Sequence, residues 1–122
     1  RYFDPGPGPE PFVFDGVRAI CFICADGGSR RCVARAAAAE PQVVFFPNNR
    51  KEPVSLEEMS RYAHATGGAL LVTNRVGKSW VHDCAGGCAV VTGDGRLRAR
   101  ANCEGREEIL IYDLRLRQVE NG

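Results

Sequence analysis

The sequence predicts an α/β fold in which a β-α-β-α-β unit is followed by an antiparallel meander. Short apolar runs rich in β-branched residues alternate with capped helical segments, a pattern typical of parallel strands joined by helical crossovers. After Gly77 the pattern changes to strands joined directly by turns. A length of 122 residues, with 44% apolar and 25% charged residues, suits one globular domain.

The first part of the chain is divided by proline, glycine and serine residues. Residues 1–11 contain several prolines and glycines and are predicted to form an extended lead-in. The predicted elements that follow are a strand at 12–14, a turn at Asp15-Gly16, a strand at 17–23, a helix from about Ser29 to Ala39, a strand at 42–46, a helix from Ser55 to about Thr66, and a strand at 69–74.

Specific residues predict where these elements begin and end. Ser29 can cap the first helix, and Ser55 with Glu58 forms a capping box for the second. Gly67-Gly68 is predicted to end the second helix, and Pro47 to end the strand at 42–46.

The part after Gly77 is predicted to be antiparallel. Residues 88–92 and 96–101 form a hairpin around Gly93-Asp94-Gly95, and residues 107–114 add a last strand. The stretch "GKSWVHDC" is interpreted as a loop.

Charge and cysteine content exclude several classes of protein. A net charge of +1 with scattered arginines gives no reason to expect a nucleic acid or a membrane as partner, and no apolar run approaches the ~18 residues of a membrane span. Cys21, Cys24 and Cys88 lie in or beside β-rich runs, unlike the cysteines of a disulfide scaffold. We therefore expect free thiols in a cytoplasmic protein, without metal or cofactor.

Polar residues gather at the predicted carboxyl ends of the parallel strands, where open α/β sheets bind ligands. These ends carry Cys24 to Asp26, Pro47 to Asn49, and Asn74-Arg75. Cys24 leaves its strand and faces the start of a helix, whose free N–H groups favour a thiolate. The backbone around Ala25, Asp26 and Gly27 can receive a developing oxyanion. Cys24 is therefore a candidate nucleophile.

Several other roles remain open for these thiols. A free cysteine is more often structural than catalytic, and Cys21, on the opposite face of the strand, is interpreted as core filler. A zinc site would pair Cys21-x-x-Cys24 with Cys84-x-x-x-Cys88, and a thioredoxin-like pair would need the two cysteines at a helix start; both are disfavoured. A Cys-His hydrolase would use His64, expected mid-helix on a partly buried face, or His82, expected in a loop.

Four segments, in order and at matching separations, resemble the C-terminal half of the carbon–nitrogen hydrolase (nitrilase/amidase) family over about residues 3–114. The segment "GVRAICFICAD" resembles the family's nucleophile strand and places the catalytic cysteine at Cys24, with Asp26 two residues on. The segments "VVFFP", "ALLVTNRVG" and "AGGCAVVTGDGRLRARA" are similar to the strands and the hairpin that follow in the family.

The resemblance implies half of a four-layer α-β-β-α sandwich, in a family usually paired through its outer helices. It also implies a Glu base, a Lys that stabilises the oxyanion and a Cys that forms a thioester. The family's Glu and Lys belong to its N-terminal half, and neither Lys51 nor Lys78 matches that Lys. We therefore expect residues 1–122 to be one partial domain, a fragment or processed chain. Alone it would be inactive, and an N-terminal half on a nicked chain or a separate subunit would complete it. The substrate would be a small amide, nitrile or N-carbamoyl compound.

The sequence also departs from the family pattern. "GSRR" replaces the Pro-Glu that usually follows the cysteine, Ala65 replaces a helix glutamate, and Cys88 replaces the hairpin serine. Arg31 is a candidate for binding an acidic group of the substrate or of a partner chain, and Asn49 and Asn74 are candidates for the pocket wall. The changes at "GSRR" and Ala65 favour an alternative, a non-catalytic nitrilase-like scaffold or binding module, and a zinc-binding domain remains a third alternative.

Overall fold

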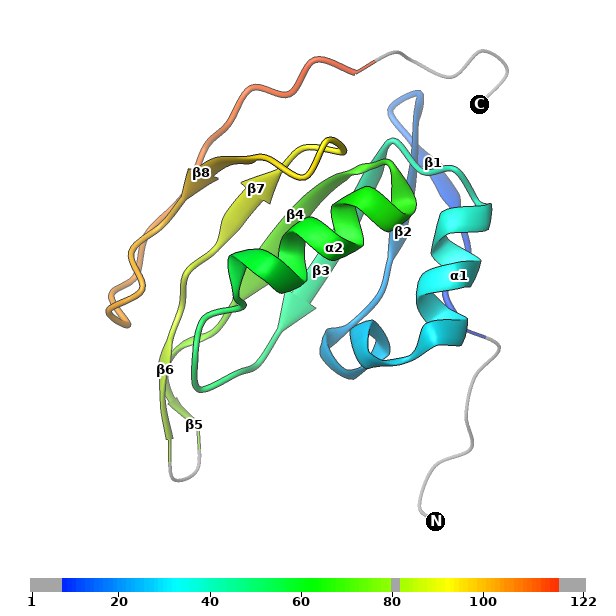
Figure 1. Cartoon of the computed structure of the whole chain (residues 1–122). Helices are drawn as coiled ribbons and strands as arrows, with labels where there is room; N and C mark the ends of the chain where they lie inside the picture. Colours follow the sequence, from blue (N-terminus) through cyan, green and yellow to red (C-terminus); the bar gives the residue numbers. More distant parts are fainter. Residues whose placement is uncertain (1–7, 80–81, 117–122) are drawn as a thin grey trace.

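One mixed β-sheet carries both helices on the same face (Figure 1). The structure is a computed structural model that describes residues 8–79 and 82–116; the side chains of residues 25, 26, 79 and 82 lie outside this description. The elements are β1 (Phe12–Phe14), β2 (Val17–Cys21), the 3-10 turn η1 (Cys24–Gly28), α1 (Arg30–Ala38), β3 (Val43–Asn48), α2 (Leu56–Thr66), β4 (Ala69–Asn74), β5 (Val76–Ser79), β6 (His82–Ala85), β7 (Ala89–Val91) and β8 (Leu97–Arg100).

The sheet has the mixed topology that the sequence predicts. Its strand order is β1-β2-β3-β4-β7-β8, and β5 and β6 form a separate two-stranded sheet. Strands β2, β3 and β4 are parallel, whereas β1, β7 and β8 pair antiparallel with their neighbours. The α/β fold class with its antiparallel meander is confirmed. The predicted turn between β1 and β2 is also confirmed, because Asp15 and Gly16 both have positive φ, as a type I′ turn requires.

The helices begin at the predicted caps. The Ser29 side chain accepts a hydrogen bond from the Cys32 N–H at 3.3 Å, and the Ser55 side chain accepts one from the Glu58 N–H at 3.2 Å. α2 ends at Gly67, whose φ of +74° is the left-handed conformation that glycine adopts without strain. Neither described helix is long and apolar enough to cross a membrane.

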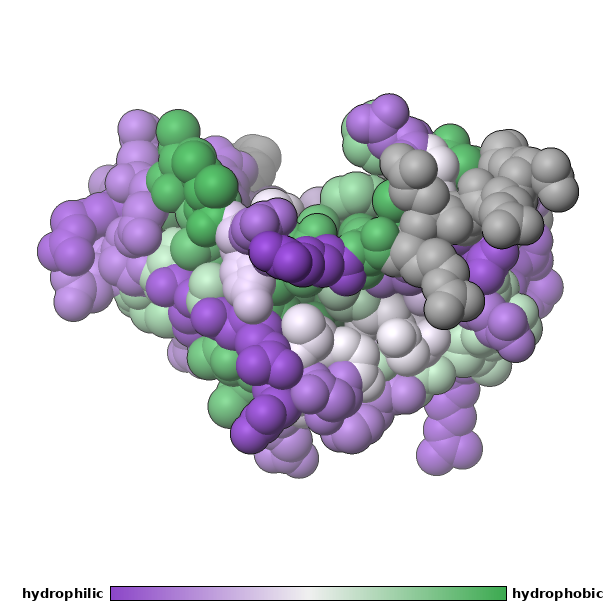
Figure 2. Space-filling model, turned by 90° about the horizontal axis from the view of Figure 1, so that it is seen from above, coloured by the Kyte–Doolittle hydropathy of each residue, from purple (hydrophilic) through white to green (hydrophobic). Residues whose placement is uncertain are grey.

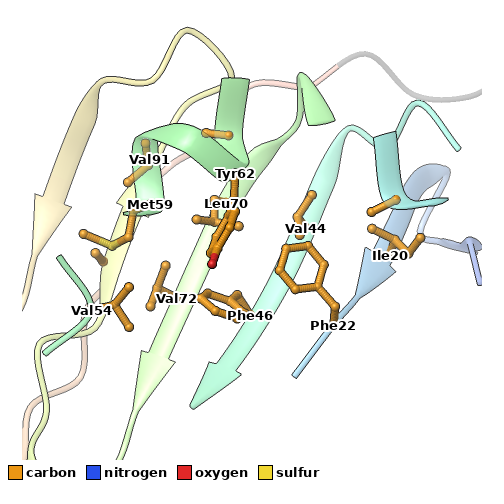
Figure 3. Close-up of a cluster of buried hydrophobic side chains, with 13 residues drawn as sticks. Ile20, Phe22, Val44, Phe46, Val54, Met59, Tyr62, Leu70, Val72 and Val91 are labelled. Carbon is orange, nitrogen blue, oxygen red and sulfur yellow. The ribbon is translucent and has the colours of Figure 1, made fainter. Parts of the chain in front are cut away.

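The core lies between the helices and one face of the sheet (Figure 3). Alternate residues of the parallel strands point toward the helices, so each strand contributes every second side chain. The largest fully buried side chains are Phe22, Phe46, Ile20, Met59, Leu70, Val44, Val54, Val72 and Val91.

The other face of the sheet is hollow and largely apolar. A cavity of about 520 Å³ is lined there by Phe45, Leu71 and Val90 and by Leu110 and Tyr112 of the C-terminal segment. Figure 2, which shows the molecule from above, displays hydrophobic side chains in the hollow of the surface. Cys21 pairs with Phe45 on this face and is partly exposed, which corrects its interpretation as core filler.

Residues 107–114 do not form the predicted last strand. They run extended, without ladder hydrogen bonds to the sheet. Their alternation is nevertheless real: Leu110 and Tyr112 line the cavity, whereas Ile109 and Ile111 are 88% and 86% exposed. The period-2 pattern indicated an extended segment with one apolar face, but pairing needs a partner edge, which the pattern does not specify.

Three further boundaries differ from the prediction. β2 ends at Cys21 rather than residue 23, and β3 continues through Pro47 to Asn48. The Phe45 carbonyl accepts a hydrogen bond from the Phe22 N–H, and the backbone of Pro47, two residues later, faces the same side of β3. Since β2 ends before that point, the missing N–H of Pro47 leaves no bond of the sheet unmade. The stretch interpreted as a loop, residues 77–84, belongs to the antiparallel pair β5-β6 in its described residues, with 80–81 outside the description. The part of the predicted lead-in at residues 1–7 lies outside the described residues.

Candidate functional site

Cys24 lies in the turn that connects β2, the first parallel strand, to α1. It is the first residue of η1, three residues after the end of β2, and it is partly exposed. Its φ of +28° is unusual for a residue with a side chain. Strained turns of this kind, between a strand and a helix, are used to present nucleophiles. The structure therefore places Cys24 at the carboxyl end of β2, as predicted.

Arg50 lies on the loop that follows β3, at the same edge of the sheet as the end of β2. Its guanidinium binds the Glu58 carboxylate at two points, Nη1 to Oε1 at 2.9 Å and Nη2 to Oε2 at 2.7 Å. The pKa of Arg50 is raised above its ordinary value, first by the hydrogen bond to Glu58 and, to a smaller extent, by Cys24, while desolvation opposes the rise.

Glu58 connects this pair to the helix. The hydrogen bond from Arg50 is the main reason why the pKa of Glu58 is lowered, and burial acts in the opposite direction. The Tyr62 hydroxyl, one helical turn later, donates to Glu58 Oε2 at 2.9 Å. Burial is the main cause that raises the pKa of the Tyr62 phenol, so this group stays a proton donor. Arg50, Glu58 and Tyr62 thus form one hydrogen-bonded chain that joins the loop after β3 to α2.

Aromatic packing fixes the position of this chain. The rings of Phe22 and Phe46 lie 5.0 Å apart, and Tyr62 packs edge-on against both, at 5.7 Å and 5.4 Å (Figure 3). The Arg50 guanidinium lies 5.6 Å from the centre of the Phe46 ring, within range of a cation–π interaction. Gly27 of η1 comes so close to Tyr62 that a Cβ there would lie 2.7 Å from its hydroxyl. The turn after Cys24 therefore rests directly on Tyr62.

Asn74 holds the loop that carries Arg50. It is 8% exposed, at the end of β4, and its Oδ1 accepts a hydrogen bond from the Arg50 N–H at 2.8 Å. Its Nδ2 donates to the carbonyls of Arg50, at 3.2 Å, and Gly86, at 2.9 Å. The whole amide is thus engaged with backbone. This places Asn74 behind the loop as a positioning residue; its role as a pocket wall stays a prediction.

The other predicted site residues are spread around Cys24. Ala25, Asp26 and Gly27 all belong to η1, as the oxyanion interpretation requires, although the side chains of Ala25 and Asp26 are outside the described part. Asn49 is exposed just beyond β3, and Arg31 is exposed in the first turn of α1. The structure therefore brings the η1 residues together with Cys24, while Asn49 and Arg31 lie at the surface.

A groove of about 530 Å³ separates α1 from α2. Its lining includes Gly27, Arg30, Arg61, Tyr62 and Ala65. Ala65, which stands where the family has a glutamate, is exposed here. Glu58, seven residues earlier and therefore on nearly the same face of the helix, is instead the carboxylate of α2 that binds Arg50.

The alternative uses of Cys24 receive no support from the described residues. Within residues 8–79 and 82–116, no group of three or more His, Cys, Asp or Glu side chains is placed to hold a metal ion. The six cysteines are free thiols. His64 is exposed on α2, contrary to the partly buried position expected for it. His82 lies in β6 rather than in a loop, and its side chain is outside the described part.

The sequence did not indicate Arg50, Glu58 or Tyr62 as site residues. In the sequence, Glu58 stands out only as the last residue of a capping box. Its N–H does donate to Ser55, as a capping box requires, but its carboxylate accepts hydrogen bonds from Arg50 and Tyr62. Arg50 lies in a polar loop whose charges have no periodicity. One signal was present: Arg50 follows the end of a buried strand, the edge at which the other site residues were sought.

Comparisons with known proteins give structural neighbours only. No protein-family model and no curated protein sequence matches the chain. A variant of a nitrilase-superfamily amidase from Nesterenkonia AN1 superposes with a TM-score of 0.71 at 22% identity, over 84% of this chain and 40% of that one. A carbon–nitrogen hydrolase from Helicobacter pylori G27 gives a TM-score of 0.73 at 21% identity, over 86% and 44%.

A third neighbour belongs to a larger enzyme. The glutamine-dependent NAD⁺ synthetase from Acinetobacter baumannii gives a TM-score of 0.75 at 19% identity, over 87% of this chain and 21% of that one. The chain thus spans about two fifths of the length of the amidase and hydrolase that it matches. The share of these two proteins that the chain covers, and the fold that it shares with them, agree with a C-terminal half of their domain. The chain therefore has the fold of the nitrilase superfamily of amidases and carbon–nitrogen hydrolases, over the part of that domain that its sequence resembles.

Proposed function

We propose that this chain carries the nucleophile of a carbon–nitrogen hydrolase, with Cys24 as that nucleophile. The observation that carries the proposal is the position of Cys24, in a strained turn at the carboxyl end of β2 and in a fold shared with amidases. In a variant of the Nesterenkonia amidase, the acetamide moiety of fluoroacetamide is covalently attached to the active-site cysteine. Cys24 is the residue of this chain that we expect to react in the same way.

The proposed reaction divides the cleavage of a non-peptide C–N bond into two steps. The Cys24 sulfur attacks the carbonyl carbon, the C–N bond breaks, and ammonia or an amine leaves with a proton, which gives a thioester. Water then attacks the thioester and releases a carboxylic acid and the free thiol. The N–H groups of η1 would stabilise the oxyanion formed in each step. Amides follow these steps directly. A nitrile would first add the thiol to give a thioimidate, which takes up water and loses ammonia to form the same thioester, and an N-carbamoyl compound would release a carbamic acid in place of the carboxylic acid.

The reaction needs groups that the described part of this chain does not place at Cys24. We propose that an N-terminal half of the same domain, on a nicked chain or a separate subunit, supplies the Glu base and the oxyanion Lys. The apolar face of the sheet opposite the helices supports this, because a face lined by Phe45, Leu71 and Val90 is suited to packing against a second layer. The outer layer of α1 and α2 is the surface we propose for homo-oligomer contacts.

The test is covalent labelling followed by mass spectrometry of the full-length protein. Fluoroacetamide should add an acetamide group to Cys24 faster than to Cys32, and Cys24→Ala should abolish both this adduct and release of ammonia from an amide panel. Ammonia release that survives Cys24→Ala would refute the assignment. The intact mass of the sample would at the same time reveal a second polypeptide, if one supplies the missing half.

A non-catalytic nitrilase-like scaffold is the second candidate. Ala65 in place of a family glutamate, and the two arginines at the start of α1, favour it. An acidic helix start is the usual arrangement, so Arg30 and Arg31 are suited to an external acidic group. Equal and slow labelling of Cys21, Cys24 and Cys32 would favour the scaffold.

A further inference from the structure

We propose that the groove between α1 and α2 is a binding site for a small amphipathic anion, a ligand that joins one carboxylate or phosphate head group to an unbranched apolar chain. The groove measures about 530 Å³, within the range of about 300–1,000 Å³ that is typical of small-molecule sites. Cys24 is not among the described residues that line it, so this inference goes beyond the proposed function of that thiol.

The lining of the groove is mostly apolar and made of small side chains. α1 contributes Val33, Ala34 and Ala37, which follow Arg30 at the spacing of one helical face, and α2 contributes Ala65. From residue 30 to residue 37 this face extends about 10 Å along the helix axis, because each residue adds about 1.5 Å. Alanine side chains leave room between the helices for a narrow hydrocarbon chain of this length.

Two cations line the same groove, Arg30 and Arg61. None of the described residues in its lining is acidic. Neither arginine forms an ion pair with another described side chain. The Glu58 carboxylate on α2 accepts its hydrogen bonds from Arg50 and from the Tyr62 hydroxyl instead. The groove therefore has two positive charges without an ion-pair partner in the described part of the chain.

The two arginines lie toward one end of the groove. Gly27, just before α1, packs against Tyr62, so the start of α1 lies beside the turn of α2 that carries Arg61. The two helices run in the same direction, because each connects parallel neighbours of one sheet. Ala37 and Ala65, which come later in their helices than the arginines, therefore lie toward the other end. An anionic head group at the arginines leaves its chain to run along the alanines.

The position of Arg30 favours an anionic ligand over a neutral one. Arg30 lies in the first turn of α1, which contains no acidic residue and where the helix dipole disfavours a cation. An anion beside this turn would offset the repulsion. A guanidinium also binds carboxylates and phosphates through two parallel N–H donors, a geometry that a neutral alcohol cannot match.

The experiment measures binding of octanoate and of octyl phosphate to the full-length protein by isothermal titration calorimetry. Octanol supplies the same chain without a charge, and acetate supplies a charge without the chain. Arg61→Gln removes one cation, and Ala34→Leu fills the groove with a residue that is also a good helix former. Arg96→Gln and Ala38→Leu are the matched controls, because both residues are exposed and neither is among the described residues of the lining.

We expect saturable binding of at least one of the two anions, weakened about tenfold or more by Arg61→Gln and abolished by Ala34→Leu. Octanol and acetate should bind about tenfold or more weakly than that anion, and the two control variants should match the unaltered protein. The anion that binds more tightly identifies the head group. Absence of saturable binding of both anions would overturn the proposal, and so would binding that neither groove substitution changes.

Sedimentation velocity with and without octanoate tests a second copy of the chain as the occupant of the groove. Octanoate that binds only to the monomer and dissociates a dimer would show that the second copy fills the groove, and this result would overturn the proposal. Failure of this inference is distinguishable from failure of the proposed function, because labelling of Cys24 by fluoroacetamide is measured independently of anion binding.

Discussion

Gly27 and Tyr62 are in direct contact: a Cβ placed on Gly27 would lie 2.7 Å from the Tyr62 hydroxyl and 2.9 Å from the ring carbon that bears it. This contact seats the turn that carries Cys24 on the second helix. It also explains why a glycine stands at position 27, where space rather than backbone conformation excludes a side chain.

Gly27→Ala should therefore destabilise the protein, because the Tyr62 ring is held between Phe22 and Phe46 and cannot move aside freely. We expect a loss of about 1–3 kcal/mol in the free energy of unfolding, the usual cost of overpacking. Gly28→Ala is the matched control, since an added Cβ there has nothing within 4 Å. Chemical denaturation of both variants checks this, and equal stability of the two would contradict the packing argument.

Tyr62→Phe tests the hydroxyl separately. It removes the hydrogen bond to Glu58 Oε2, 2.9 Å long, and should cost about 1 kcal/mol. In the double variant with Gly27→Ala, loss of the hydroxyl removes the 2.7 Å clash but leaves the ring carbon at 2.9 Å. The two substitutions should therefore be less destabilising together than the sum of their separate effects. A double-mutant cycle measures this coupling, and strict additivity would count against the contact.

The Glu58 carboxylate should make stability depend on pH. Arg50 lowers the pKa of Glu58 in the folded protein, so the stabilisation is complete above the ordinary glutamate value of about 4.3 and is lost as the pH falls through the lower folded value. At pH 7, Glu58→Gln should cost about 2 kcal/mol, and this difference should shrink in acid. Urea unfolding across the acidic range measures it.

Glu57→Gln is the control for this titration, because Glu57 is an exposed carboxylate in the same helical turn. It should change stability little at any pH. A Glu58→Gln difference that stays constant from neutral to strongly acidic pH would show that the ion pair with Arg50 does not titrate as proposed.

Asn74 and Asn49 should respond differently to alanine. Asn74→Ala removes the amide that binds the backbone of Arg50 and Gly86, and it leaves buried groups without partners. We expect about 2–4 kcal/mol of destabilisation from several lost hydrogen bonds. Asn49→Ala, at an exposed position, should be within about 0.5 kcal/mol of the unaltered protein. Thermal unfolding of the two variants tests both expectations.

The sequence by itself determined the element order, the helix caps and the place of Cys24. Apolar runs, Ser29, Ser55 and Gly67 act locally, so their effects can be predicted from neighbouring residues. The parallel unit then places Cys24 at the carboxyl ends of the strands, whatever else surrounds it. The same local pattern failed at residues 107–114, because hydrogen-bond pairing depends on a partner edge far away in the chain.

Only the tertiary structure decided which polar groups meet at the loop after β3. Arg50 and Glu58 are eight residues apart on a loop and a helix, and Asn74 reaches that loop from 24 residues further along. No sequence period links such positions. They come together because α2 packs on β3 and β4, and because buried amide and carboxylate groups must find hydrogen-bond partners once water is excluded.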